Sequence, residues 1–158
     1  MDVVVTRAER SDFLEIAALD RTGWAKNRNA DYVADGEHVW RHWVDYALTF
    51  VARAPGGALL GFVITFPTIK PRYYYLHKLL LAEGCRGKGV GGALLEPVCM
   101  LFDKKAITVE LTTDTNNMPM HNLIARFGFH EDRLEKGYYR ENEDRLVFIR
   151  KPKTETAA

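Results

Sequence analysis

The stretch Cys85–Pro97, CRGKGVGGALLEP, places four glycines within six residues and continues as an apolar run of helical character. Glycine costs roughly 0.5–1 kcal/mol relative to alanine inside regular structure, so this cluster indicates a backbone that approaches another molecule closely. The free N–H groups at a helix N-terminus attract anions, and glycines let the backbone reach them. The stretch therefore predicts a phosphate-binding loop at the start of a helix.

The segments around this loop predict a mixed α/β sheet. Segments rich in β-branched and aromatic residues indicate strands, and apolar residues at helical spacing indicate helices. The first helix is expected to begin after Ser11 or Asp12 as N-cap and to end at Gly23. Pro55-Gly56-Gly57 indicates a hairpin turn, and Gly128 closes the last helix. The expected order is a strand at 2–8, helices at 11–23 and 37–48, strands at 49–54, 58–67 and 72–81, a helix at 89–104, a strand at 106–114, a helix at 117–128, and a closing strand pair at 129–139 and 144–152. The first half would be antiparallel, and strand–helix–strand crossovers would follow it.

Length and composition bound the class of protein. The chain has 158 residues, 47% of them hydrophobic and 27% charged, which predicts one globular domain over residues 1–152 and a disordered tail over 153–158. A net charge of +1 gives no field that would recruit nucleic acid. Cys85 and Cys99 have neither zinc-site nor disulfide-framework spacing, so no metal is expected. With no long apolar run and no signal-like start, we expect a soluble, cytoplasmic protein without membrane contact.

Three phosphate-binding motifs compete for the glycine loop. The dinucleotide fingerprint is present as Gly87, Gly89 and Gly92, with Glu110 about 20 residues further on, but that motif should follow its strand directly, and residues 82–86 intervene here. The P-loop pattern fails because no Ser or Thr follows Lys88. The segment Arg86–Gly91 matches the third pattern, [Q/R]-x-x-G-x-[G/A], which binds the pyrophosphate of acetyl-CoA.

The chain resembles the GCN5-related N-acetyltransferases, the GNAT family, over nearly its whole length. Besides the loop, Asn117 followed by Gly128-Phe129 resembles the family's second motif, and the element order is the family's own. The resemblance implies a GNAT-like acyl-CoA N-acyltransferase fold. This fold has a mixed, mostly antiparallel central sheet that is splayed between its fourth and fifth strands and flanked by about four helices. It also implies that acetyl-CoA is the co-substrate.

The resemblance assigns the cofactor to two parts of the chain. The pyrophosphate would lie on the glycine loop, and the pantetheine arm would lie between the splayed strands. There it would bond to the backbone of the fourth strand on one side and to Asn117 on the other. The implied cofactor-binding residues are Leu79, Leu81, Arg86, Gly87, Lys88, Gly89, Val90, Gly91, Gly92 and Asn117.

The catalytic residues follow less directly. Relatives often carry a Glu on the fourth strand, where this chain has Tyr75. Strand alternation places Tyr75, His77, Leu79 and Leu81 on one face, so His77 is the expected base, because imidazole titrates near neutral pH. Asp35 and Glu37 are weaker candidates, and a core role for His77 stays open.

The proton donor is a second departure from the family. Relatives often place a Tyr four residues before the Gly-Phe glycine, and Ile124 stands there in this sequence. Tyr138 and Tyr139, near the expected closing strands, are the remaining candidates for the acid. Release of the thiolate directly to solvent is the alternative.

The first two helices and the loop between them resemble the family's acceptor-selecting region. Trp24 and Tyr32, together with Tyr75, are the expected substrate-binding residues, whereas Trp40 and Trp43 are expected in the core. We therefore predict an N-acetyltransferase that acetylates a primary amine on a small molecule or a peptide. A homodimer is an assembly that the sequence leaves open. A non-catalytic acyl-CoA sensor and a nicotinamide-dependent enzyme are the alternatives.

Overall fold

The computed structural model describes residues 2–27, 30–31 and 34–153. Its order of strands and helices is the order expected from the sequence. The elements are β1 Val4–Arg7, the 3₁₀ helix η1 Arg10–Asp12, α1 Phe13–Ala25, α2 Glu37–Tyr46, β2 Leu48–Arg53, β3 Leu59–Pro67, β4 Tyr73–Leu81, α3 Val90–Lys104, β5 Thr108–Asp114, α4 Met118–Ala125, β6 His130–Glu135 and β7 Arg145–Arg150. The expected tail, 153–158, lies outside the described residues from 154 on.

The strands follow the order β1-β2-β3-β4-β5-β7-β6. The pairs β1–β2, β2–β3, β5–β7 and β6–β7 are antiparallel, and β4–β5 is parallel. The parallel pairing covers Tyr73–Tyr75 and Thr108–Glu110, although β4 continues to Leu81 and β5 to Asp114. The seven-stranded mixed sheet with its parallel β4–β5 pair confirms the predicted fold class.

The chain divides into two compact units, Met1–Thr65 with Lys78–Leu94 and Phe66–His77 with Leu95–Ala158. Unit 1 holds β1, α1, α2, β2, most of β3, the last residues of β4 and the glycine loop. Unit 2 holds the first residues of β4, most of α3, β5, α4, β6 and β7. The division falls inside β4, between His77 and Lys78, and inside α3, between Leu94 and Leu95.

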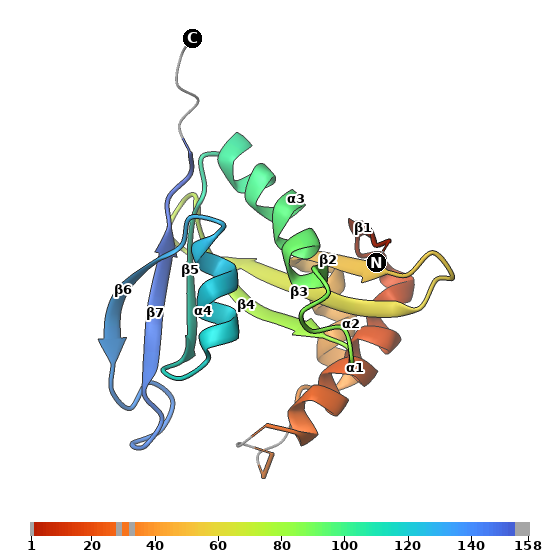
Figure 1. Cartoon of the computed structure of the whole chain (residues 1–158), viewed down its shortest axis with the longest axis horizontal. Coiled ribbons are helices and arrows are strands. Elements are labelled where there is room, and N and C mark those ends of the chain that lie inside the picture. The colour runs from red at the N-terminus through yellow and green to blue at the C-terminus, as the bar shows by residue number, and fades with distance from the viewer. Residues whose placement is uncertain (1, 28–29, 32–33, 154–158) are drawn as a thin grey trace. The chain divides into compact units, whose positions relative to one another are not determined.

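In unit 1, α1 and α2 lie side by side (Figure 1) and pack on the strands. The fully buried Trp40 of α2 meets Phe62 of β3 edge-on, with ring centroids 5.2 Å apart. Helix α1 continues past Gly23 to Ala25, which corrects the expected end. A Cβ on Gly23 would lie 2.9 Å from the δ-carbons of Leu80, so this glycine permits close helix–strand contact.

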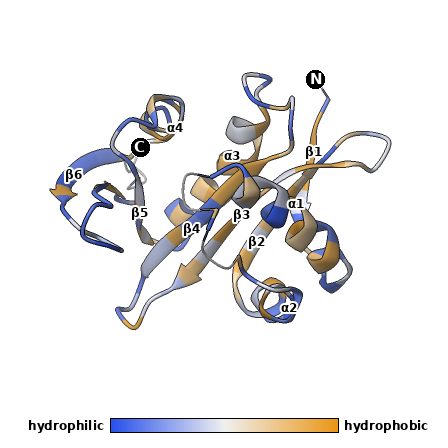
Figure 2. Ribbon diagram, turned by 90° about the horizontal axis from the view of Figure 1, so that it is seen from below, coloured by the Kyte–Doolittle hydropathy of each residue, from blue (hydrophilic) through white to orange (hydrophobic). Residues whose placement is uncertain are grey.

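In unit 2, α3 and α4 pack against strands. Alternate residues of β5 are buried, as a strand with one covered face requires. Arg150 is almost fully buried and donates to Asp103 of α3 and to the Phe127 carbonyl, each at 2.7 Å. Strand β6 at the sheet edge is mostly hydrophilic (Figure 2), as suits a strand with one unpaired side.

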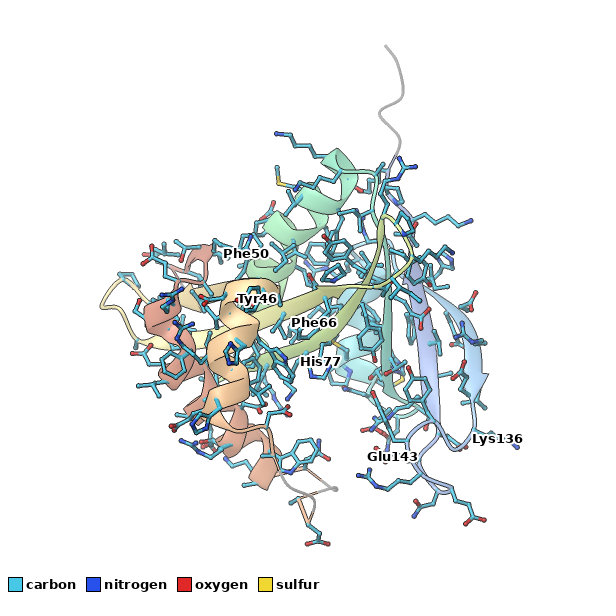
Figure 3. All side chains as sticks on the ribbon, turned by 180° about the vertical axis from the view of Figure 1, so that it is seen from behind. Tyr46, Phe50, Phe66, His77, Lys136 and Glu143 are labelled. Carbon is cyan, nitrogen blue, oxygen red and sulfur yellow. The ribbon has the colours of Figure 1, made fainter. Side chains whose placement is uncertain are left out.

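The turn between β6 and β7 is longer than expected. Strand β6 ends at Glu135 rather than at Tyr139, because Gly137 takes a positive φ of 60° and its N–H donates to Asp144 Oδ1 at 3.0 Å. Lys136 and Glu143 lie in this turn (Figure 3). Tyr138 and Tyr139 are therefore turn residues, and their side chains need not alternate between two faces as they would in a strand.

Candidate active site

The glycine loop of unit 1 has the geometry of an anion-binding helix start. Gly84, Gly87 and Gly89 take positive φ values of 75°, 73° and 84°, and a Cβ on any of them would meet nothing within 4 Å. Helix α3 begins at Val90, and the Ala93 N–H donates to the Gly89 carbonyl at 3.0 Å. The first N–H groups of a helix have no carbonyl partner within it. The loop therefore presents backbone donors beside open space.

The charged side chains of the loop are exposed, and the glycines of the first helical turn are not. Arg86 and Lys88 are exposed, whereas Val90 and Gly91 are buried and Gly92 is partly buried. An anion at the helix start would thus meet backbone donors directly and the two cations from the solvent side. Such a pair of contacts fits a pyrophosphate.

The end of β4 offers an apolar edge. Lys78 bonds to Asp20 of α1, and Leu80 lies against Gly23 of the same helix. Because side chains alternate along a strand, Leu79 and Leu81 point to the other side. Both are partly exposed.

Asn117 is the N-cap of α4. Its side-chain oxygen accepts from the Met120 N–H at 3.3 Å, and the residue is exposed. This cap leaves the amide nitrogen of Asn117 available to another partner.

Unit 2 brings together a cluster of hydroxyl groups that the sequence separates widely. The Tyr75 hydroxyl lies 2.8 Å from Thr112 Oγ1 and 3.5 Å from the Tyr139 hydroxyl. The rings of Tyr138 and Tyr139 meet edge-on, 4.6 Å between centroids. We call these four residues the tyrosine cluster. Three predicted site residues thus converge, and Thr112 joins them without having been predicted.

The hydroxyls of Tyr75 and Tyr138 are held in their neutral form. Burial raises the pKa of Tyr75 well above its usual range, and the bond with Tyr139 adds to this. The pKa of Tyr138 is raised as well, first by burial and then by the neighbouring Tyr139. Neutral phenols donate hydrogen bonds, so the cluster can supply a proton or stabilise developing negative charge.

His77 lies beside this cluster. Its ring meets Phe66 edge-on at 5.5 Å between centroids and lies 6.4 Å from the ring of Tyr75. Figure 3 shows Phe66 and His77 close together. His77 is half-buried, and its proximity to Tyr75 agrees with their expected common face.

A charge network supports the turn that carries Tyr138 and Tyr139. Glu143 is buried, and Arg140 donates to it at 2.6 Å. Arg145 bonds to Glu143 and Asp114, and its guanidinium lies 5.3 Å from the centroid of the Tyr139 ring. The sequence did not predict this network, because a run of charged residues in a turn usually indicates side chains exposed to solvent.

The residues expected to face the acceptor are only partly described. Trp24 is half-buried on α1, and Tyr32 lies outside the described residues. Trp40 is fully buried, as expected, and Trp43 contacts it at 4.9 Å while keeping some exposure. Glu37, a weaker candidate for the base, pairs with Arg21 at 3.0 Å.

The structure gives a packing role to Ile124 and a hydrogen-bonding role to Glu110, two residues that the sequence motifs had singled out. Ile124, at the position where relatives often have a Tyr, is fully buried in α4. Glu110, the acidic residue of the dinucleotide reading, accepts from the Tyr73 hydroxyl at 2.6 Å. Burial, and after it the bond with Glu110, raises the pKa of Tyr73 to about 12.

The described residues contain neither a candidate membrane span nor a candidate metal cluster. Over 2–27, 30–31 and 34–153, no helix has the length and apolar character to span a membrane. In the same part of the chain, no group of three or more His, Cys, Asp or Glu side chains is placed to hold a metal ion.

Comparison with known proteins identifies the family. A family model described as the acetyltransferase (GNAT) family matches residues 12–129. No curated protein matches the sequence. Three similar solved structures are the ribosomal-protein-S18-alanine N-acetyltransferase from Escherichia coli (18% identity, 99% of each chain, TM-score 0.77), an N-acetyltransferase from Staphylococcus aureus Mu50 (17% identity, 97% of this chain and 100% of that chain, TM-score 0.82) and the NatC complex bound to Gag peptide and CoA (20% identity, 97% of this chain and 100% of that chain, TM-score 0.76). At these identities the structures show the shared fold.

Proposed function

Because the chain belongs to the acetyltransferase (GNAT) family and is an acetyl-CoA-dependent N-acetyltransferase, we propose that it acetylates a primary amine by direct attack of the amine on the thioester. The observation that carries the proposal is the glycine loop at the start of α3. Its positive-φ glycines leave space where side chains would otherwise stand. No observation favours a non-catalytic sensor.

In this proposal the cofactor binds mainly to backbone. The N–H groups of residues 87–92 hold the pyrophosphate, and Arg86 and Lys88 add positive charge. The backbone of Leu79 and Leu81 bonds to the pantetheine arm, and the Asn117 amide meets it as well. The partly exposed leucine side chains give the arm an apolar surface.

His77 serves as the base, directly or through water. An alkylammonium has a pKa of about 10.4, so only about one molecule in a few thousand is a free amine at pH 7. Forming the neutral amine is therefore a major part of the free-energy barrier, and a base that removes the proton near the acceptor lowers this barrier. The contacts of His77 with Tyr75 and Phe66 orient its ring.

The tyrosine cluster serves as the proton donor. When the amine attacks, the carbon–sulfur bond breaks and the thiolate must take up a proton or enter solvent. Tyr139 is exposed and close to Tyr75, so its hydroxyl can be reprotonated from solvent. Arg145 holds the ring of Tyr139 in place. Tyr138 is the second candidate for the same role.

The acceptor is a small primary amine or a peptide amine. The E. coli enzyme named above acts on an alanine of ribosomal protein S18, and the NatC complex binds a Gag peptide, so peptide acceptors occur on this fold. The residues that we expect to bind the acceptor are Trp24, Tyr32 and Tyr75. We place the reaction in the cytoplasm, because Cys85 and Cys99 are free thiols. A homodimer is a further expectation.

The test is ligand-dependent stabilisation followed by turnover. A ligand that binds only the folded state raises Tm by mass action. Acetyl-CoA and CoA should raise Tm, NADPH should not, and thiol should be released from acetyl-CoA with at least one member of an amine library. A rise with NADPH alone would overturn the assignment of the loop.

A further inference from the structure

One end of unit 2 gathers cations that the proposed chemistry does not use. The Arg72 carbonyl, just before β4, accepts from the Thr108 N–H at the start of β5, at 2.9 Å. The Lys153 N–H, just after β7, donates to Asp103 of α3 at 2.7 Å (Figure 1). These bonds hold the turn after β3, the end of α3 and the end of β7 close to the starts of β4 and β5. We call the six exposed cations of these segments the basic end: Lys70, Arg72, Lys104, Lys105, Lys151 and Lys153.

The cations of the basic end are not neutralised by acids. Within the described part of the chain, none of the six side chains is in an ion pair, and Lys70 contacts the ring of Tyr73 at 4.6 Å. Asp103, beside Lys104, already pairs with Arg150. By contrast, acids pair with all the arginines of β6, β7 and the turn between them, which are Arg133, Arg140, Arg145 and Arg150.

The net charge of the whole chain conceals this end. The chain has 22 Lys and Arg residues and 21 Asp and Glu residues, so that 16 basic residues stand against 21 acidic ones once the six are set aside. Arg126 and Glu131, which flank the basic end, carry opposite charges. A local positive field of this kind attracts polyanions over about a Debye length, roughly 10 Å at 0.1 M salt.

An apolar side chain projects beside these cations. Ile69 is fully exposed in the turn between β3 and β4. The turn is held by bonds from the Thr68 N–H and hydroxyl to the Tyr73 carbonyl, at 3.0 and 2.8 Å, and from the Tyr73 N–H to the Lys70 carbonyl at 3.2 Å. One exposed apolar residue is ordinary on a protein surface. Here, however, it is held at the tip of a bonded turn, next to Lys70 in the chain.

The composition of the basic end favours an anionic lipid surface as the partner. Five of its six cations are lysines, which act as point charges, whereas arginine supplies the planar fork that recognises bases and carboxylates. Protein interfaces are depleted in lysine. Single-stranded nucleic acids stack on exposed aromatic rings, but Tyr73 and Tyr74 are half-buried. Lysines around an apolar tip match anionic headgroups above acyl chains.

We propose that the basic end docks the protein on the surface of membranes that contain anionic lipids, with Ile69 entering the boundary between headgroups and acyl chains. Such docking is peripheral and needs no spanning helix. It departs from the expectation of no membrane contact, which considered only long apolar runs and signal-like starts. The docking uses none of the residues assigned to the chemistry, so it is independent of the proposed function.

Sedimentation with vesicles tests the partner. One set of vesicles is phosphatidylcholine alone, and the other contains equal amounts of phosphatidylcholine and phosphatidylserine. We expect binding only to the second set, and loss of most of it at about 1 M salt, where the Debye length falls to about 3 Å. Equal binding to both sets, or binding to neither, would overturn the proposal. Binding to duplex RNA or to polyglutamate without binding to the phosphatidylserine vesicles would assign the basic end to another class of partner and would also overturn it.

Lysine substitutions test the basic end itself. Lys151→Gln should weaken binding to the phosphatidylserine vesicles about fivefold, because each cation near an anionic surface contributes about that factor. The combination of Lys104→Gln, Lys105→Gln and Lys151→Gln should weaken it about 100-fold. Lys136→Gln is the matched control, an exposed lysine of the same unit in the turn between β6 and β7 (Figure 3). Equal losses for Lys136→Gln and Lys151→Gln, or no loss for the triple variant, would contradict docking through this end.

An apolar substitution tests the tip. Ile69→Ala removes three carbons, each worth about fourfold in affinity when it enters the acyl region, so binding should weaken at least about tenfold. Met100→Ala, an exposed apolar residue of α3, is the control and should bind as the wild type does. Unchanged binding of Ile69→Ala, or an equal loss in both variants, would overturn insertion of the tip. Vesicle binding is measured without acetyl-CoA or amine, so a failure of the proposed function would leave this result standing.

Discussion

The glycine loop at residues 84–92 and the tyrosine cluster differ in how the sequence encodes them. The loop is one continuous stretch whose backbone carries the predicted binding function. The tyrosine cluster joins three segments, and its Tyr75 and Tyr139 are 64 residues apart in the chain. Backbone donors of a loop and a helix start can be recognised from local spacing alone, whereas a side-chain cluster depends on how distant segments pack.

The two regions should therefore respond differently to substitution. In the loop, the glycines carry no side chain, so adding one there should harm cofactor binding first. In the tyrosine cluster and at His77, removing a polar group should harm the chemical step and leave cofactor affinity almost unchanged. The predictions below test this division, from the largest expected effect to the smallest.

His77→Ala should have the largest effect on rate. Loss of a general base lowers the rate by about 10²–10⁴-fold, while acetyl-CoA affinity should change little. A base works only in its neutral form, so the fall of kcat/KM toward acidic pH should also disappear in the variant. Rate, affinity and Tm are measured together. A large drop in Tm with near-normal turnover at low temperature would return His77 to a packing role beside Phe66.

Gly89→Asp should weaken cofactor binding by about 100-fold, because a carboxylate would face the pyrophosphate. Gly89→Asn is the matched control, since Asp and Asn are the side chains that best tolerate a positive φ. It should bind CoA much more tightly than the Asp variant. Calorimetry with CoA and with pantetheine, which lacks the pyrophosphate, checks this. Equal losses of affinity for CoA and for pantetheine would mean that the loop does not bind the pyrophosphate.

Tyr139→Phe should lower kcat by about tenfold, because the thiolate is a fair leaving group and needs less help than an alkoxide. KM for acetyl-CoA should stay the same. The exposed Tyr46, on α2, provides the control Tyr46→Phe. If Tyr138→Phe is slow and Tyr139→Phe is not, the donor is Tyr138. If both keep full rate, the thiolate leaves to solvent unaided.

Asp103→Asn should affect neither region and should change only the pH dependence of stability. Burial raises the pKa of Asp103, but the bonds from Arg150 and the Lys153 N–H outweigh it and hold the pKa below its usual range. A carboxyl with a lowered folded pKa stabilises fully above its unfolded pKa of about 3.9, and this contribution is lost as pH falls through the folded pKa. The Tm difference between wild type and variant should be constant from about pH 7 to 5 and shrink below about pH 4. A constant difference down to pH 3 would contradict this assignment.

Most of the fold could be read from the sequence, because its patterns are local. Strand and helix order followed from apolar periodicity, and the start of α3 came within one residue of its expected position at Gly89. The ends of the helices and strands were predicted less accurately where tertiary contacts decide the boundary. Helix α1 passes Gly23 because that glycine serves contact with Leu80 rather than a helix end. Strand β6 ends before Tyr138 and Tyr139, because the bond between Gly137 and Asp144 closes a turn that contains both tyrosines.

The sequence by itself determined the family, the mixed sheet and the candidate pyrophosphate loop, because each depends on short-range spacing that the backbone carries. Only the tertiary structure decided which side chains meet. It joined Tyr75 to Thr112 and Tyr139, buried Glu143 between two arginines, and placed Lys78 between Asp20 and the indole rings. Such contacts arise from long-range packing, in which the free energy of a side chain depends on neighbours that no local pattern names. The residues that would move protons and select the acceptor belong to this second class.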